Sequence, residues 1–260
     1  MPVLRYLYFL YRRIGTGLGF VIFLGGGLLL ALIAFPAIDL FTPRGAKRSA
    51  RYQALMRRSF RAFVGVLTGL RVIAVKIDDP CLLRGTTGVI VVANHPTLID
   101  IVLLSAYIPR AQCIVKRALW DSRFLGHIMR GANYIPNDLP PEELVDTCRA
   151  ALADGRSLVV FPEGTRSQPG RPVHFQRGFA HLATLLEVDI QLARITCTPP
   201  TLGKGEKWWE VPRTHCPLFR VSPAGWIRAA SWQGADYRSM AARDIVRRVE
   251  RLYNEQHAAG

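Results

Sequence analysis

A histidine and an aspartate five positions apart are the residues of this chain best suited to do chemistry. His95 and Asp100 lie in the segment HPTLID, which directly follows Asn94. A neutral imidazole can take a proton from a hydroxyl group while the oxygen of that group attacks a carbonyl carbon. An aspartate on the other ring nitrogen fixes the tautomer and stabilises the imidazolium that forms. Because no serine lies on a Gly-x-Ser-x-Gly elbow, the attacking oxygen would belong to the substrate.

A second segment, FPEGTRS at residues 161–167, carries groups that suit a phosphate. Gly164 permits a tight turn that brings backbone N–H groups close to an anion. Thr165 adds a hydroxyl donor, and the planar guanidinium of Arg166 can bind phosphate oxygens. Glu163 can hold substrate hydroxyls or a nearby base. The alternative is a surface turn closed by a Glu–Arg pair. Taken together, the two segments indicate chemistry on a hydroxyl of a phosphorylated substrate.

Strands and helices that alternate from about residue 71 onward must position these segments. We expect strands at 71–77, 88–93, 113–115, 133–135, 158–161 and 190–197. We expect helices at 97–108, 141–153, 178–186 and 237–253. This alternation predicts an α/β fold with a mixed or largely parallel sheet flanked by helices. Ligands of such sheets bind outside the carboxyl ends of strands, where both segments fall.

An uncharged stretch of 25 residues runs from Ile14 to Ile38. It exceeds the roughly 20 residues that cross a bilayer core, and it is too long and glycine-rich for a signal-peptide core. We expect an N-terminal membrane-embedded helical segment that either spans the bilayer or bends at 25–27 and dips into one leaflet. The alternative is a buried helix of a soluble core. The larger basic cluster follows the stretch, which favours a catalytic domain on the cytoplasmic side of the inner membrane.

Positive charge is concentrated in the first 77 residues, where twelve Lys/Arg and one acid, Asp39, supply +11 of the formal net charge of +15. Residues 51–70 predict an amphipathic helix with an apolar stripe made of Met56, Phe60, Phe63, Val64 and Leu67. Its arginines fall on the other side, and they are Arg51, Arg57, Arg58 and Arg61. This helix either lies on anionic membrane lipids or packs on the catalytic domain with a solvated basic face. No nucleic acid is expected, because no nucleic-acid-binding motif accompanies the charge.

The five cysteines are scattered and form no Cys-x-x-Cys pair. This pattern fits a reducing compartment and argues against a disulfide framework or a zinc site, so we expect no metal. The chain therefore divides into a membrane anchor with a basic helix at residues 1–70 and a catalytic domain at residues 71–260.

At the two chemical segments the chain resembles the 1-acylglycerol-3-phosphate O-acyltransferase family, also called lysophosphatidic acid acyltransferases. In that family Asn-His-x4-Asp is the catalytic block and Phe-Pro-Glu-Gly-Thr-Arg-Ser the glycerol-phosphate block. The resemblance covers roughly residues 60–200 and implies His95 and Asp100 as the catalytic pair. It also implies a lysophospholipid acceptor, most directly 1-acyl-sn-glycerol-3-phosphate, and an acyl-carrier-protein or coenzyme A thioester as co-substrate. It implies no cofactor, metal or covalent intermediate, and an N-terminal membrane-embedded helical segment is usual there.

Two further family blocks match less closely. Lys116 is present and is expected to assist, but Asn137 stands where an arginine is usual, so one phosphate ligand is missing. The usual Phe-Lys-x-Gly is replaced by residues 175–178, FQRG, in which Arg177 is the replacement cation. Residues 204–232 also contain four tryptophans outside the family pattern. An acyltransferase for another acceptor, such as an amino-acid lipid or specialised lipid conjugate, therefore stays open. A lipid hydrolase and a catalytically silent lipid-binding protein are the remaining alternatives.

Overall fold

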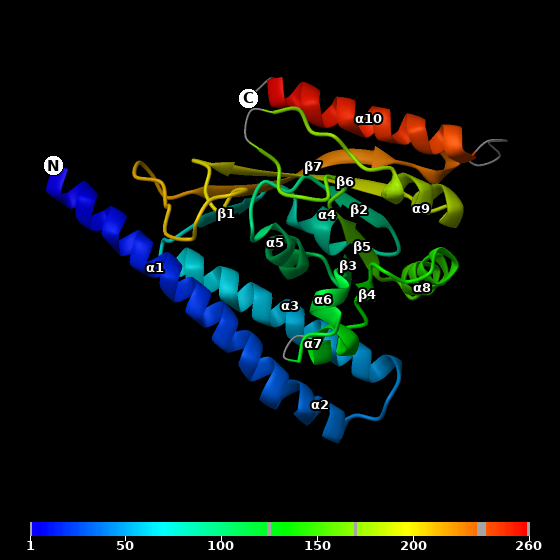
Figure 1. Cartoon of the computed structure of the whole chain (residues 1–260), viewed down its shortest axis with the longest axis horizontal. Coiled ribbons are helices and arrows are strands. Elements are labelled where there is room, and N and C mark those ends of the chain that lie inside the picture. The colour runs from blue at the N-terminus through cyan, green and yellow to red at the C-terminus, as the bar shows by residue number, and fades with distance from the viewer. Residues whose placement is uncertain (1, 124–125, 169–170, 233–237, 259–260) are drawn as a thin grey trace.

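The computed structural model describes residues 2–123, 126–168, 171–232 and 238–258 (Figure 1). Its sheet has the strand order β1-β7-β6-β2-β5-β3-β4. The strands are β1 (Ala74–Ile77), β2 (Ile90–Ala93), β3 (Ala111–Val115), β4 (Ile135–Pro136), β5 (Ser157–Val160), β6 (Ile190–Thr198) and β7 (Leu218–Ile227). All neighbouring strands are parallel except β6 and β7. The predicted mixed, largely parallel sheet is therefore confirmed.

Helices cover both faces of this sheet (Figure 1). The helices after residue 70 are α4 (Pro80–Arg84), α5 (Asp100–Tyr107), α6 (Arg117–Trp120), α7 (Gly126–Gly131), α8 (Pro141–Ala153), α9 (Gly178–Leu186), the short η2 (Ala229–Ser231) and α10 (Arg238–Ala258). Along β2, Ile90 and Val92 pack with α8, α9 and α10, whereas Val91 and Ala93 pack with α4 and α5. Successive side chains of a strand point to opposite faces, so this fully buried strand needs apolar residues at every position.

The N-terminal region is a hairpin of two long helices. Its first arm runs without a break through α1 (Pro2–Leu29), the π-helical turn η1 (Leu30–Ala34) and α2 (Phe35–Phe41), and its second arm is α3 (Ala46–Gly69). Among the described residues, one helix is both long enough and apolar enough to cross a membrane, and it is this first arm. Residues 25–27 lie inside it, and the chain reverses at 42–45 instead. The alternative of a bend at these glycines is therefore wrong, since α1 continues through them.

Helix α3 uses its apolar stripe to pack on the sheet domain that follows it. Val64 and Leu67 are buried against Val102 and Leu103 of α5, in one cluster. The arginines of the predicted basic side are exposed at positions 51, 58 and 61 and half-buried at 57. Of the two alternatives for this helix, the structure shows the one packed on the domain with a solvated basic face. The core is therefore continuous across residue 70.

Strand β7 is an element that the sequence patterns did not predict. Pro223 and Gly225 interrupt its β-forming residues, and proline within a strand normally argues against pairing. The structure accommodates them with a β-bulge, because Leu192 pairs with Gly225 and the next residue, Ala193, pairs with Pro223. Strand β1 pairs only with residues 218–221 of β7, so at Pro223 the strand has β6 as its only neighbour among the described strands. The missing N–H of proline therefore costs no hydrogen bond to β1.

Helix α10 fastens the carboxyl ends of the two central strands. The buried hydroxyl of Tyr253 lies 3.0 Å from the carbonyl oxygen of Val92 and 2.7 Å from that of Ala193, and its single proton serves both acceptors. The helix ends at Ala258, beyond the predicted residue 253, and the predicted start at residue 237 lies outside the described residues. The C-terminal helix thus supports β2 one residue before its end.

Candidate active site

The carboxyl ends of three neighbouring parallel strands bring the predicted site residues to one edge of the sheet. Strand β5 lies between β2 and β3. His95 follows β2, the FPEGTRS segment follows β5, and Lys116 follows β3 directly. This is the edge at which open parallel sheets bind ligands. The fold therefore explains why segments almost seventy residues apart in sequence can act together.

His95 and Asp100 form a hydrogen-bonded pair. The Nδ1 atom of His95 lies 2.8 Å from Oδ2 of Asp100, whose side chain is fully buried. The ring of Phe161 stacks on the imidazole, with centroids 4.3 Å apart and planes 24° apart. The imidazole remains 23% exposed. Because Nδ1 is engaged by the carboxylate, Nε2 is the nitrogen that faces a substrate, as a general base requires.

Thr97 completes the surroundings of the buried carboxylate. Its backbone N–H donates to Oδ2 of Asp100 at 2.6 Å, and its hydroxyl donates to Oδ1. Burial raises the pKa of the Asp100 carboxyl above its ordinary value, while the hydrogen bonds from His95 and Thr97 act in the opposite direction. The predicted helix at 97–108 begins only at Asp100, because residues 97–99 form this turn.

Sequence reasoning assigned no role to Thr97, although a signal existed. A threonine followed three residues later by an acid at a helix start resembles a capping box, in which the acid accepts the threonine backbone N–H. Here that acid is also the partner of the candidate base, so one carboxylate begins the helix and contacts the imidazole.

Glu163 and Ser167 hold the backbone of the histidine. Oε1 of Glu163 accepts the backbone N–H of His95 at 2.9 Å and the hydroxyl of Ser167 at 2.8 Å. The backbone N–H of Ser167 donates to the carbonyl oxygen of His95, also at 2.8 Å. Of the two predicted uses of Glu163, the structure shows contact with the base, through its backbone. Ser167 is the last residue of the FPEGTRS segment, but its bonds to Glu163 and His95 could be found only from the three-dimensional structure.

Asn94 fixes the strand immediately before the base. Its side-chain amide donates to the carbonyl oxygen of Ile195 at 2.8 Å, and its Oδ1 accepts the N–H of Ile195 at 2.7 Å. The buried amide thus imitates a strand pairing and extends the contact between β2 and β6. His95 is the next residue, so its backbone is held by the Asn94–Ile195 hydrogen bonds on one side and by the Glu163 segment on the other.

The phosphate-binding candidates of the second segment form an open turn. Gly164 has φ +69°, a left-handed conformation that favours glycine, and a Cβ there would displace the side-chain amide of Gln176. Thr165 is exposed next to it. Arg166 donates through one terminal nitrogen, Nη1, to the carbonyl oxygens of Leu202 (2.9 Å) and Gly203 (2.7 Å). Its Nη2 and Nε groups carry the remaining N–H donors of the guanidinium.

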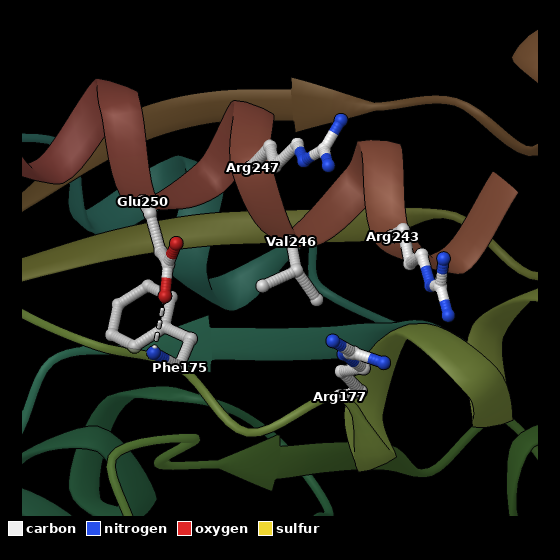
Figure 2. Close-up of a pocket in the computed structure, with 6 residues that line it drawn as sticks. All are labelled: Phe175, Arg177, Arg243, Val246, Arg247 and Glu250. Atoms are coloured by element: carbon white, nitrogen blue, oxygen red, sulfur yellow. Dashed lines mark hydrogen bonds between the residues drawn. The ribbon is translucent and has the colours of Figure 1, made fainter. Parts of the chain in front are cut away.

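Arg177 lies in a separate cleft of about 400 Å³ between the start of α9 and α10. Arg243 and Arg247 of α10 also line it, and the guanidinium groups of Arg177 and Arg243 face the same space (Figure 2). Glu250 at the other end accepts the backbone N–H of Phe175 at 2.7 Å. The cleft is therefore rich in positive charge, and its carboxylate is engaged by the backbone.

Lys116 and Asn137 lie on the β3 side of the site. The side chain of Lys116 is exposed directly after β3. Asn137 accepts the backbone N–H of Arg117 through Oδ1 at 3.1 Å, and its own N–H donates to the carbonyl oxygen of Val115 at 2.9 Å. The residue that stands in place of the family's arginine thus closes the turn in which Lys116 lies.

An apolar cavity of about 470 Å³ adjoins the turn that follows His95. Leu98, three residues after His95, and Ile99 line it, and so do Phe20 and Phe23 of α1. Helix α3 and the loop at residues 199–217 supply the other walls. A volume of this size is typical of small-molecule sites, and walls of this composition suit a hydrocarbon chain.

Residues 74–197 match the model of the protein family described as Acyltransferase. This segment belongs to the acyltransferase family. The match begins at β1 and ends one residue before the end of β6, so the acyltransferase domain contains the two strand ends that carry His95 and the FPEGTRS segment. The family resemblance expected from these two segments is confirmed.

Relatives and a solved structure agree with this assignment. A Cocos nucifera protein named 1-acyl-sn-glycerol-3-phosphate acyltransferase is 33% identical over 137 residues, which are 48% of this chain and 44% of that protein. A Helicobacter pylori protein of the same name is 34% identical over 112 residues, covering 41% of this chain and 47% of that protein. The matched segments thus span less than half the length of both relatives.

The crystal structure of the 1-acyl-sn-glycerophosphate acyltransferase PlsC from Thermotoga maritima has the same fold. The TM-score is 0.65 with 18% sequence identity, and the comparison covers 96% of this chain and 98% of that one. The shared architecture therefore extends beyond the acyltransferase domain to the flanking elements.

Proposed function

We propose that this protein is a membrane-associated O-acyltransferase that acylates the free hydroxyl of a lysophospholipid. The best-supported acceptor is 1-acyl-sn-glycerol-3-phosphate, which would become phosphatidic acid. The observation that carries the proposal is the His95–Asp100 pair, whose turn contributes Leu98 and Ile99 to the wall of an apolar cavity and lies beside a turn suited to phosphate. The names of the relatives support the same acceptor.

In the proposed reaction Nε2 of His95 takes the proton of the acceptor hydroxyl as its oxygen attacks the carbonyl carbon of an acyl thioester. The new C–O bond forms, the C–S bond breaks, and the leaving thiolate receives the proton from the imidazolium. Asp100 stabilises the charged imidazolium between these two transfers, and Glu163 keeps the base in place through its backbone. The step uses side chains of this protein and no cofactor.

The acceptor phosphate would lie at the turn formed by Gly164, Thr165 and Arg166, with Lys116 approaching from β3. Two observations support this position. Arg166 keeps donor groups beyond the nitrogen that binds the carbonyl oxygens of the neighbouring loop. Thr165 and Lys116 are both exposed at the edge of the sheet that carries His95.

The cleft of Arg177, Arg243 and Arg247 would serve the acyl donor. An acyl-carrier-protein thioester and a coenzyme A thioester both carry a phosphopantetheine arm with phosphate, and Arg guanidinium groups bind phosphate strongly. The cleft and the phosphate turn are separated by one short segment, because Gln176 contacts Gly164 and its N–H donates to the carbonyl oxygen of Pro162 at 2.8 Å. The cleft is thus close enough to the site to hold part of a substrate.

Charge reversal tests this assignment. We expect R243E/R247E to raise the donor KM about tenfold or more, because each lost charge-assisted bond contributes about 1.5–3 kcal/mol, while the acceptor KM stays unchanged. The matched control is R248E/R251E, which changes the charge of the same helix by the same amount at exposed positions. Equal effects of the two double variants would mean that only net charge matters. The assay is run with acyl-carrier-protein and with coenzyme A thioesters. The donor whose KM rises in R243E/R247E is the one that binds in the cleft.

We further propose that α1 lies in one leaflet of the cytoplasmic membrane, with the acyltransferase domain on the cytoplasmic side. One side of α1 is apolar and exposed, at Leu7, Ile14, Leu18 and Val21 among others. The opposite side packs on the domain, since a Cβ at Gly19 would meet the side chain of Leu67 at 2.8 Å. A helix with protein along one side cannot be surrounded by lipid, so an orientation along the membrane surface is favoured over a span.

The experiment that tests the reaction is acyl transfer by the full-length protein in membranes, with labelled carrier-protein and coenzyme A thioesters and lysophosphatidate. We expect His95→Ala to lower kcat by at least about 100-fold, the usual contribution of a general base. His181→Ala, at an exposed position on α9, is the control. Unchanged transfer by His95→Ala would refute the mechanism. Release of free fatty acid without acceptor, at the rate of transfer, would instead identify a hydrolase.

A further inference from the structure

The loop between β6 and β7 presents two tryptophan rings to solvent. Trp208 is 42% exposed and Trp209 37% exposed, and their rings meet edge to face with centroids 5.4 Å apart. Large aromatic side chains seldom remain exposed in adjacent positions without a partner, and contiguous exposed apolar surface marks interaction sites. The relevant partner must be identified from what surrounds the pair.

Trp208 rests directly on α1. A Cβ at Gly17 would lie 2.8 Å from the Trp208 ring, and the ring of Phe20 lies 6.2 Å from it, centroid to centroid. The same turns of α1 expose Ile14, Leu18 and Val21. The tryptophan pair therefore adjoins the exposed apolar side of the helix.

Arg12 holds this loop in place. Its side chain is only 1% exposed, and its guanidinium donates to the carbonyl oxygens of Pro212 and His215, both at 2.5 Å. A buried arginine that satisfies two backbone carbonyls joins α1 and the loop into one unit. The position of the tryptophans relative to α1 is therefore fixed by the fold.

The charges of the loop are arranged for an anionic surface. Lys204 and Lys207 are exposed, and the Lys207 ammonium lies 5.2 Å from the centre of the Trp209 ring. The two nearby acids are turned to the backbone, because Glu206 accepts the N–H of Gly203 and Glu210 accepts the N–H of Lys207, each at 2.8 Å. Tryptophan prefers the membrane–water interface, and lysine next to it can reach the phosphate groups of the lipids.

We propose that Trp208 and Trp209 form a second membrane contact, in which both rings insert into the interfacial layer of an anionic bilayer beside α1. This inference rests on the proposed membrane association of α1 and adds a contact made by the loop at residues 203–213. Val211 and Pro212 of the same loop also line the apolar cavity next to the catalytic turn. The loop would thus place one wall of the cavity at the membrane surface, where acyl chains are available.

Depth-dependent fluorescence quenching tests the contact. The full-length protein is bound to phosphatidylglycerol–phosphatidylcholine vesicles whose acyl chains carry bromine either close to the head group or near the bilayer centre. Helix α1 contains no tryptophan, so the signal does not report on it. We expect strong quenching by the shallow bromines, weaker quenching by the deep ones, and loss of most of the quenching in W208F/W209F. The control variant Trp226→Phe, in β7, should keep it.

A binding measurement distinguishes failure of this inference from failure of the membrane proposal. We expect Trp209→Glu to weaken partition onto the vesicles at least about threefold, since it replaces buried aromatic surface by charge, with thermal unfolding in detergent unchanged. If the wild-type protein binds vesicles while its tryptophans stay unquenched, the loop contact is refuted and the contact of α1 stands. If it does not bind at all, both are refuted.

Discussion

At the scale of single residues, the proposed base is held by groups that come from both chemical segments. Asp100 and Phe161 orient the ring of His95, while Glu163 and Ser167 bind its backbone. The pairing of His95 with Asp100 could be predicted, because five positions across a turn allow contact. The bond from Glu163 to the backbone could not, because it joins residues 68 positions apart and depends on β2 and β5 being neighbours.

Thr97 provides a prediction about orientation. Thr97→Val removes the hydroxyl donor to Asp100 and keeps the backbone donor and the shape of the side chain. One hydrogen bond to a charged group contributes about 1.5–3 kcal/mol, so we expect kcat to fall roughly 10- to 100-fold with the acceptor KM unchanged. Steady-state kinetics measure this, and Thr97→Ser should restore most of the rate. A wild-type kcat in Thr97→Val would show that the hydroxyl does not matter.

At the scale of elements, regular patterns were predictable and irregular ones were not. Helices α8 and α9 have the expected bounds, and at α8 proline and two acids mark the start and Gly155 follows the end. Strand β7 was missed, because the bulge that accommodates Pro223 and Gly225 is a property of its partner strand as well as of its own sequence. The reversal at 42–45 was not predicted either. The three successive glycines at 25–27 indicated a possible bend there, but the helix continues through them.

Two glycines of α1 give a matched pair of variants. A Cβ at Gly19 would lie 2.8 Å from the side chain of Leu67, whereas a Cβ at Gly25 would have no atom within 4 Å. Alanine should stabilise the helix by about 1 kcal/mol at either position through propensity alone. Overpacking costs about 1–3 kcal/mol, so we expect Gly25→Ala to raise Tm and Gly19→Ala to lower it. Thermal unfolding in detergent measures both, and an equal rise would show that α1 is not packed on α3.

At the scale of the whole molecule, we expect charge and apolar surface to act together in the proposed membrane binding. The first 77 residues carry most of the net charge of +15, and the exposed side of α1 is apolar. Basic residues near an anionic membrane contribute about 1 kcal/mol each, and raising salt from 0.1 to 1 M shortens the Debye length from about 10 to about 3 Å.

We therefore expect partition onto anionic vesicles to fall at least about tenfold over this salt range and then to level off at a plateau set by apolar contact. Vesicle sedimentation measures it. Zwitterionic vesicles are the control and should show weaker binding with little dependence on salt. Complete release at high salt would contradict insertion of α1, and a constant affinity would contradict a role for the charge.

The strand order has a consequence for the biosynthesis of this protein. Among the described residues, β7 is the last strand to leave the ribosome, yet it lies between β1 and β6. The N-terminal arm emerges first and can meet the membrane while the sheet still has a gap. The edge of β6 that β7 covers, and the support that Tyr253 gives to β2, are completed only in the last part of translation. With α1 on the membrane as proposed, the nascent chain would thus be tethered before its sheet is complete.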